Sequence, residues 1–301
     1  MNTNISLIKL FAVLLAVLIP IGTYANPGDL YATDNSSIRI YAPDGTARVF
    51  ASGLPRPRGL AFDGFGNLFV ATVDTSTTFH DDKGQILKFA PDGTVTVFAA
   101  GAGLETPEGL AFDSAGNLYI VSVYFNSGNF HAPSGNPGPL ANAGNGRVTE
   151  IAPSGERSVL HLDPTTDHQN FGIAIDGQNN LFVADNFQSA IYKITPDRRV
   201  SIFVSLFDSV GLAFDGAGNL YASGGGPEVF EPGTITKIAP DGTQTLVVSG
   251  LWSIRGLAFD HNGNLFGAGH SDNVIYKITP GGSVSVFATG LNVPQFLAVE
   301  P

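Results

Sequence analysis

The chain has 301 residues, and 15 Lys and Arg against 26 Asp and Glu give it a formal net charge of −11. So few basic residues cannot form the cationic surface that holds a phosphate backbone, so no nucleic-acid partner is expected. The absence of cysteine excludes disulfides, thiolate metal sites and cysteine nucleophiles, while 37 Gly and 19 Pro predict many short strands joined by tight turns.

Residues 1–25 have the layout of a secretory signal peptide. Lys9 is the only charged residue, residues 10–19 are all apolar, and Ala25 is a small residue of the kind that precedes a cleavage site. A helix of this length covers only about half of a bilayer core, so a permanent membrane anchor is the weaker interpretation. We therefore expect cleavage after Ala25 and a secreted or periplasmic protein, with no stable membrane insertion after cleavage.

From residue 28 onwards, a unit of roughly forty residues repeats along the chain. Its first segment reads GLAFD or a close variant, at 59–63, 109–113, 172–176, 211–215, 256–260 and 296–300. Most copies continue with Gly-Asn-Leu and an aromatic residue, then a segment ending in Pro-Asp-Gly or a similar turn, then a short alternating run. Each segment lies between turn residues, so each unit predicts four antiparallel strands, with the Asp of GLAFD capping the first turn.

The order of these segments predicts how the fold closes. Residues 28–52 supply only the second, third and fourth segments of a unit, whereas 296–300 supply an isolated first segment. An array of six four-stranded units closes best as a radial β-propeller, which leaves only short edges. The sequence therefore predicts an all-β, six-bladed propeller over 26–301, a single domain in which strand 296–300 pairs with the strands of 28–52.

The repeated pattern is similar to NHL repeats over nearly the whole chain after the signal peptide. It resembles the six-bladed senescence-marker/gluconolactonase and strictosidine-synthase-like families, and streptogramin lyases. The resemblance implies the fold, but not the chemistry, because propellers serve as enzymes and as binding platforms. In the lactonase family a divalent cation such as calcium is held by acidic and amide side chains at the starts of the inner strands. Only Glu108 matches that pattern here, which puts a calcium-dependent lactonase activity in doubt and leaves the cofactor open.

All large insertions follow the second strand of a unit and therefore lie on one face of the predicted ring. They span 74–84, 123–146 and 224–233. Rigid elements with elaborated loops on one face commonly carry a binding site. We expect the site there, and the loop 123–146, rich in Gly, Asn and Pro, as a surface for a protein partner if there is one.

The residue before each first segment is expected at the mouth of the central channel, on that same face. These residues are Arg58, Glu108, Phe171, Val210, Arg255 and Gln295. Guanidinium groups present planar arrays of donors, so Arg58 and Arg255 are expected to bind the oxygens of a small anionic or polyhydroxylated ligand. Glu108 is the first candidate for a catalytic base or metal ligand, beside small inner-strand residues that leave room. Structural ion pairs among these residues are an equally open interpretation.

Other polar residues lie near the same predicted face. His270 is the second catalytic candidate, an acid or base that Asp272 could orient. Asn170, Trp252 and Gln295 are further candidates for substrate contacts.

Asp74 and Asp185, at the ends of second strands, join Glu108 as candidate metal ligands. His80 with Asp81 and Asp82 could also bind a metal, although a solvated acidic loop explains them more simply. Two functions stay open: a hydrolase or lyase acting on a lactone or ester at the channel mouth, and a non-catalytic propeller that binds a small ligand or a protein.

Overall fold

The structure is a computed structural model of the chain, and it describes residues 26–74, 83–101, 103–104, 106–123, 147–162, 170–224 and 232–301. The expected signal peptide (1–25) lies outside these ranges, as do nearly all of the loop 123–146 and the group His80, Asp81 and Asp82. None of the described segments forms a helix with the length and apolar character that crossing a bilayer requires.

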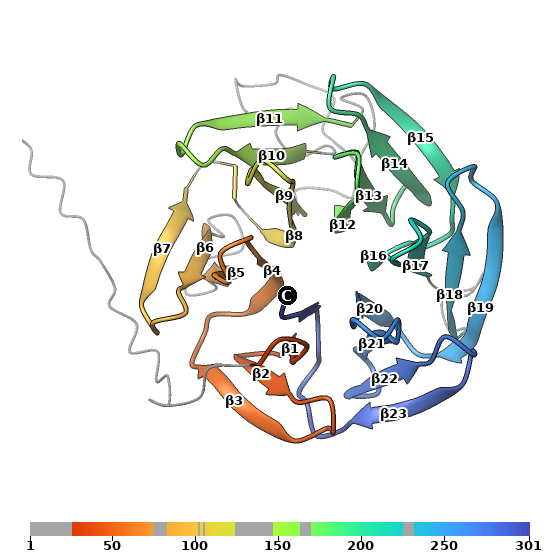
Figure 1. Cartoon of the computed structure of the whole chain (residues 1–301). Coiled ribbons are helices and arrows are strands. Elements are labelled where there is room, and N and C mark those ends of the chain that lie inside the picture. The colour runs from red at the N-terminus through yellow and green to blue at the C-terminus, as the bar shows by residue number, and fades with distance from the viewer. Residues whose placement is uncertain are drawn as a thin grey trace, which may run out of the picture.

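The described strands form six four-stranded antiparallel sheets arranged as blades around a centre (Figure 1). Blade 1 contains β24 (Leu297–Val299), β1 (Leu30–Thr33), β2 (Ser37–Tyr41) and β3 (Ala47–Ser52). Blade 2 contains β4 (Pro57–Phe62), β5 (Leu68–Asp74), β6 (Lys83–Phe89) and β7 (Val95–Ala100). Blade 3 contains β8 (Pro107–Phe112), β9 (Leu118–Ser122), β10 (Arg147–Ile151) and β11 (Arg157–His161).

The other three blades follow the same order from the centre outwards. Blade 4 contains β12 (Asn170–Ile175), β13 (Leu181–Asp185), β14 (Ala190–Ile194) and β15 (Val200–Ser205). Blade 5 contains β16 (Leu212–Phe214), β17 (Leu220–Gly224), β18 (Gly233–Ile238) and β19 (Gln244–Leu251), and blade 6 contains β20 (Ile254–Phe259), β21 (Leu265–Gly269), β22 (Val274–Ile278) and β23 (Val284–Ala288). The six-bladed propeller predicted from the repeats is confirmed.

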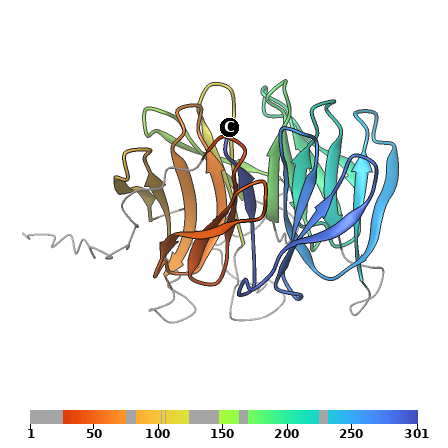
Figure 2. The ribbon, with the colours of Figure 1, turned by 60° about the horizontal axis from the view of Figure 1, so that its bottom comes forward.

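The C-terminal strand closes the ring as predicted. β24 pairs antiparallel with β1, with Leu30 opposite Val299 and Ala32 opposite Leu297. The chain therefore ends at the centre of the ring in Figure 1, and near the top of the tilted view in Figure 2.

The repeated Asp residues cap the turns between the first two strands of a blade. Asp63 Oδ1 accepts hydrogen bonds from the backbone N–H groups of Phe65 and Asn67, both at 2.9 Å, and Oδ2 accepts one from the Asn67 amide at 2.7 Å. The same arrangement recurs at Asp113, Asp176, Asp215 and Asp260. These carboxylates are committed to local structure on the face away from the expected site.

The inner strands are glycine-rich because neighbouring blades come very close together. A Cβ atom at Gly59 would lie 2.0 Å from the Glu108 carbonyl oxygen of the next blade, and one at Gly172 or Gly211 would lie 2.1 Å from the equivalent carbonyl. The cavity between the inner strands, lined among others by Leu60, Gly109 and Gly172, has a volume of only about 50 Å³. The small residues therefore bring the blades together and leave little room in the channel, contrary to the expectation from sequence.

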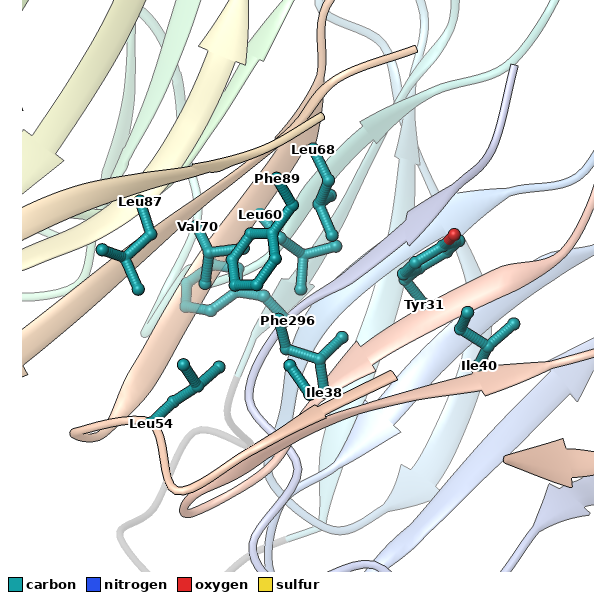
Figure 3. Close-up of a cluster of buried hydrophobic side chains, with 11 residues drawn as sticks. Tyr31, Ile38, Ile40, Leu54, Leu60, Leu68, Val70, Leu87, Phe89 and Phe296 are labelled. Atoms are coloured by element: carbon teal, nitrogen blue, oxygen red, sulfur yellow. The ribbon is translucent and has the colours of Figure 1, made fainter. Parts of the chain in front are cut away.

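Blade 1 has Phe296 where the other inner strands have glycine. Its ring enters a core cluster between blades 1 and 2, among Leu54, Leu60 and Val70 (Figure 3). The closing strand is thus held by side-chain packing as well as by its pairing with β1.

Candidate functional site

Four of the six predicted mouth residues lie at the starts of the inner strands, and Val210 and Gln295 come two residues before β16 and β24. Arg58, Glu108, Phe171 and Arg255 are each the second residue of their strand. In each of these four strands the pairing register shifts at this residue and the glycine after it, which marks a β-bulge. Bulges re-aim side chains and are common beside functional sites. In blades 2, 3, 4 and 6 a bulge thus changes the direction of the side chain at the predicted mouth position.

Two guanidinium groups converge on one amide oxygen at the mouth. Arg58 Nη1 donates to Gln295 Oε1 at 2.8 Å, and Arg255 Nη1 donates to the same oxygen at 3.4 Å. Gln295 is buried, and its amide nitrogen donates to the Val293 carbonyl at 3.0 Å, which fixes the direction of the oxygen. Within the described part of the chain, no carboxylate forms a salt bridge with Arg255. The Arg255 guanidinium is therefore held by the Gln295 amide oxygen rather than by a direct salt bridge.

Glu108 is the buried counter-charge of this pair. Its side chain is 5% exposed, Oε1 lies 3.6 Å from Arg58 Nε, and the buried Oε2 has no hydrogen-bond partner among the described residues. Burial raises the pKa of Glu108, and the opposing effects of Arg58 and Arg255 are smaller. Sequence left the direction of this shift open because it could not compare the two effects.

His270 lies in the field of the same two arginines. Burial, and then the charges of Arg255 and Arg58, lower the pKa of His270 from 6.5 to about 4. The imidazole is therefore neutral near pH 7, with a free electron pair that can accept a proton. Asp272 accepts a hydrogen bond from the Tyr276 hydroxyl, so its carboxylate is engaged there.

The depressed pKa of His270 predicts a specific pH dependence. Between about pH 6.5 and pH 4 the unfolded chain binds a proton that the folded chain does not, so the contribution of His270 to stability falls as the pH drops through this window. Histidine resonances followed by NMR should show one imidazole titrating near pH 4, and Arg255→Met should raise that midpoint. A His270 midpoint near 6.5 that Arg255→Met leaves unchanged would contradict this electrostatic description.

Two residues that the sequence did not single out for a role complete the mouth. The Arg255 guanidinium carbon lies 5.5 Å from the centre of the Phe171 ring, in a cation–π contact. Asp208 accepts a hydrogen bond from the Asn186 amide, and burial raises its pKa while Arg255 opposes the rise. The repeat pattern in the sequence predicted Phe171 at the channel mouth. The interaction between Asp208 and Arg255 is evident only in the folded chain.

The loops that lead into the inner strands repeat an unusual backbone conformation. Two residues before the mouth position, four blades have a non-glycine residue with positive φ: Arg56 (39°), Asp208 (55°), Ser253 (46°) and Val293 (57°). Such conformations cost of order 1–3 kcal/mol each and persist where the surrounding structure enforces them. Strained loops and bulges together hold the mouth side chains in fixed positions.

For the remaining predicted residues the structure gives a position in the fold but no contact with this group. Trp252 is 45% exposed in the loop before β20. Asn170 starts β12 opposite Asp185, but the side chains of Asn170 and Asp74 are outside the described part of the structure. Asp185 is buried and accepts a hydrogen bond from the Gln188 backbone N–H at 3.1 Å, which stabilises its turn.

The described residues do not fit the divalent cation that the lactonase resemblance suggests. No three His, Asp or Glu side chains gather as a metal cluster within the described ranges. Glu108, the one residue that matches the lactonase pattern, has the positive charges of Arg58 and Arg255 as neighbours. Two guanidinium groups repel a dication, whereas they attract an anion.

Comparison with known proteins identifies the fold. No family model matches the sequence, and no curated protein matches it. Virginiamycin B lyase from Staphylococcus aureus is similar in structure, with a TM-score of 0.61, 14% identity and coverage of 94% of this chain and 90% of the lyase. A gluconolactonase from Xanthomonas campestris gives 0.62, 15% identity, and coverage of 93% and 91%. The chain therefore shares the six-bladed propeller of known lyases and lactonases, at identities that establish the fold alone.

Proposed function

We propose that this protein is an exported hydrolase or lyase that acts on a small anionic or oxygen-rich molecule at the channel mouth. The observation that carries the proposal is the convergence of Arg58 and Arg255 on one neutral amide oxygen, near a neutral His270. Structural similarity to a lyase and a lactonase supports the same reaction classes. The signal-peptide pattern of residues 1–25 supports export.

The two guanidinium groups would bind the negatively charged oxygen of the substrate. In a low-dielectric site, fixed cations stabilise charge that develops on a carbonyl oxygen. Gln295 aims both groups at one point by accepting a hydrogen bond from each. Glu108 Oε1 lies 3.6 Å from Arg58 Nε, so Glu108 acts as a positioning residue for Arg58.

His270 would serve as the general base. In hydrolysis it takes a proton from water, whose oxygen bonds to the carbonyl carbon, and it returns the proton to the departing alkoxide. In a lyase reaction it takes the proton next to a carbonyl group, and the freed electron pair expels the leaving group. An anionic substrate would neutralise the two arginines that lower the pKa of His270, so binding would itself strengthen the base.

A non-catalytic ligand-binding propeller is the second candidate. It is favoured by the pKa of about 4 for His270, since a base so weak transfers protons poorly at neutral pH. The cavity of about 50 Å³ between the inner strands is also too small for a ligand of more than a few atoms. In that case the arginines would bind the ligand and no bond would be made or broken.

A panel of lactones and esters assayed with the purified chain separates the two candidates. For a substrate that is turned over, His270→Ala should lower kcat at least about a hundredfold, because a general base contributes roughly that much or more. His261→Ala is the matched control, since His261 lies in the turn between β20 and β21, away from the mouth. The wild-type kcat/KM should also hold its plateau down to about pH 4, where a free His270 becomes protonated.

Two results would overturn the catalytic assignment. Equal kcat values for His270→Ala, His261→Ala and the wild type would exclude His270 as the base. Tight binding of panel compounds with no turnover by the wild type would favour the non-catalytic propeller.

A further inference from the structure

The two ends of the described chain meet beside β1 and β24 in blade 1. The backbone N–H of Gly28 donates to the Glu300 carbonyl at 3.0 Å, and the N–H of Glu300 donates to the Asp29 carbonyl at 2.9 Å. In the other five blades the first two strands are consecutive in the chain and a turn joins them. In blade 1 the first two strands are β24 and β1, from opposite ends of the chain, so no turn joins them. The closing blade is therefore held at this edge by non-covalent contacts.

The Asp29 side chain is fully buried at this junction. Its Oδ2 accepts hydrogen bonds from the Asn26 backbone nitrogen and from Arg48 Nη2, both at 3.1 Å. Its Oδ1 has no hydrogen-bond partner among the described residues. A buried carboxylate oxygen without a donor is destabilising. The Asp29 carboxylate can therefore accept further hydrogen bonds.

Among the residues that the structure describes at this junction, negative charge exceeds positive charge. The Asp29 and Glu300 carboxylates share one nearby guanidinium, that of Arg48, and the Tyr31 hydroxyl donates to Glu300 Oε2 at 3.0 Å. Burial raises the pKa of Glu300, and the neighbouring Asp29 carboxylate adds to the rise. One further positive charge would balance the junction.

We propose that cleavage between Ala25 and Asn26 creates an α-ammonium group that pairs with Asp29 and fastens the closing blade. Hydrolysis by a signal peptidase adds one water across the bond, leaving a carboxylate on Ala25 and an amine on Asn26. That amine is protonated at neutral pH. The nitrogen that donates one N–H to Asp29 at 3.1 Å then carries three N–H bonds and a positive charge. Processing at this bond thus supplies the charge and the donors that the buried carboxylate lacks.

The test compares chains that differ at the N-terminus and at residue 29. One chain begins at Asn26 and another carries Gly-Ser before it, so that Asn26 keeps an ordinary peptide nitrogen. Each is made with Asp29 and with Asp29→Asn, and thermal unfolding is followed by circular dichroism at pH 6.5. With Asp29 present, the chain that begins at Asn26 should unfold about 3 to 6 °C higher than the extended one. With Asp29→Asn the difference should fall below about 1 °C.

Three results would overturn the proposal. One is equal unfolding temperatures for the two N-termini in the presence of Asp29, which decides the matter even if Asp29→Asn does not fold. Another is the same difference with and without Asp29. The third is an exported full-length chain whose measured mass shows a mature N-terminus at a residue other than Asn26.

Discussion

A chain that ends at Pro294 is expected to lose cooperative unfolding or to become insoluble. The deletion of 295–301 removes β24, the inner strand of blade 1, and leaves β1 with an unpaired edge at the centre of the ring. It also removes Phe296 from the core cluster between blades 1 and 2. Thermal unfolding followed by circular dichroism measures the effect. A truncated chain that melts within a degree or two of the parent would contradict closure by the C-terminal strand.

A milder substitution separates packing from strand pairing. Phe296→Ala keeps the backbone of β24 and should lower the free energy of unfolding by about 3–5 kcal/mol, the usual cost of truncating a buried phenylalanine. Phe65→Ala is the matched control, because Phe65 is 87% exposed in a turn and should change stability by less than about 0.5 kcal/mol. Equal effects of the two substitutions would show that Phe296 does not anchor the closing strand.

Gly59→Ala is expected to be among the most destabilising single methyl additions in the chain. The new Cβ would lie 2.0 Å from the backbone oxygen of Glu108 and 3.0 Å from the Gly109 Cα, and backbone atoms of a neighbouring blade cannot move aside locally. We expect a loss of more than about 4 kcal/mol, which corresponds to a fall in Tm of roughly 10 °C or more.

Gly64→Ala adds the same methyl group to the same blade as a control. Nothing lies within 4 Å of its Cβ position, and Gly64 is not among the glycines with positive φ. The substitution should leave stability unchanged or raise it slightly, by up to about 1 kcal/mol, through a less flexible unfolded chain. Comparable melting temperatures for the two variants would contradict the close approach of the inner strands.

The sequence was sufficient for the fold because local and global signals agree in every repeat. Period-two runs, Gly and Pro turns and the capping Asp recur in register, and the unpaired segments at 28–52 and 296–300 leave one way to complete the sixth blade. The glycines were harder to interpret. Their spacing can be seen in the sequence. The reason that glycine is needed there is the close approach of another blade, which involves residues about fifty positions apart, such as Gly59 and Glu108.

The site was predictable in position and less so in chemistry. The repeat fixes which residues reach the mouth, so Arg58, Glu108, Arg255 and Gln295 could be found by counting. The bulges that turn them there, and the burial that outweighs two arginines at Glu108, depend on three-dimensional packing. The same is true of His270, whose low pKa comes from charges on other strands.

The affinity of the channel mouth for small anions tests the proposed site most directly. Titration calorimetry with a panel of small carboxylates and hydroxy acids would compare the wild type with Arg255→Met and with Arg199→Met. Arg199 is the matched control, since its side chain is 85% exposed and pairs with Asp197 in the turn before β15. For any compound bound by the wild type, Arg255→Met should weaken Kd at least about tenfold, a change of about 1.4 kcal/mol, and Arg199→Met should leave it unchanged. Equal affinity in all three proteins, or no binding by the wild type across the panel, would contradict an anion site at the channel mouth.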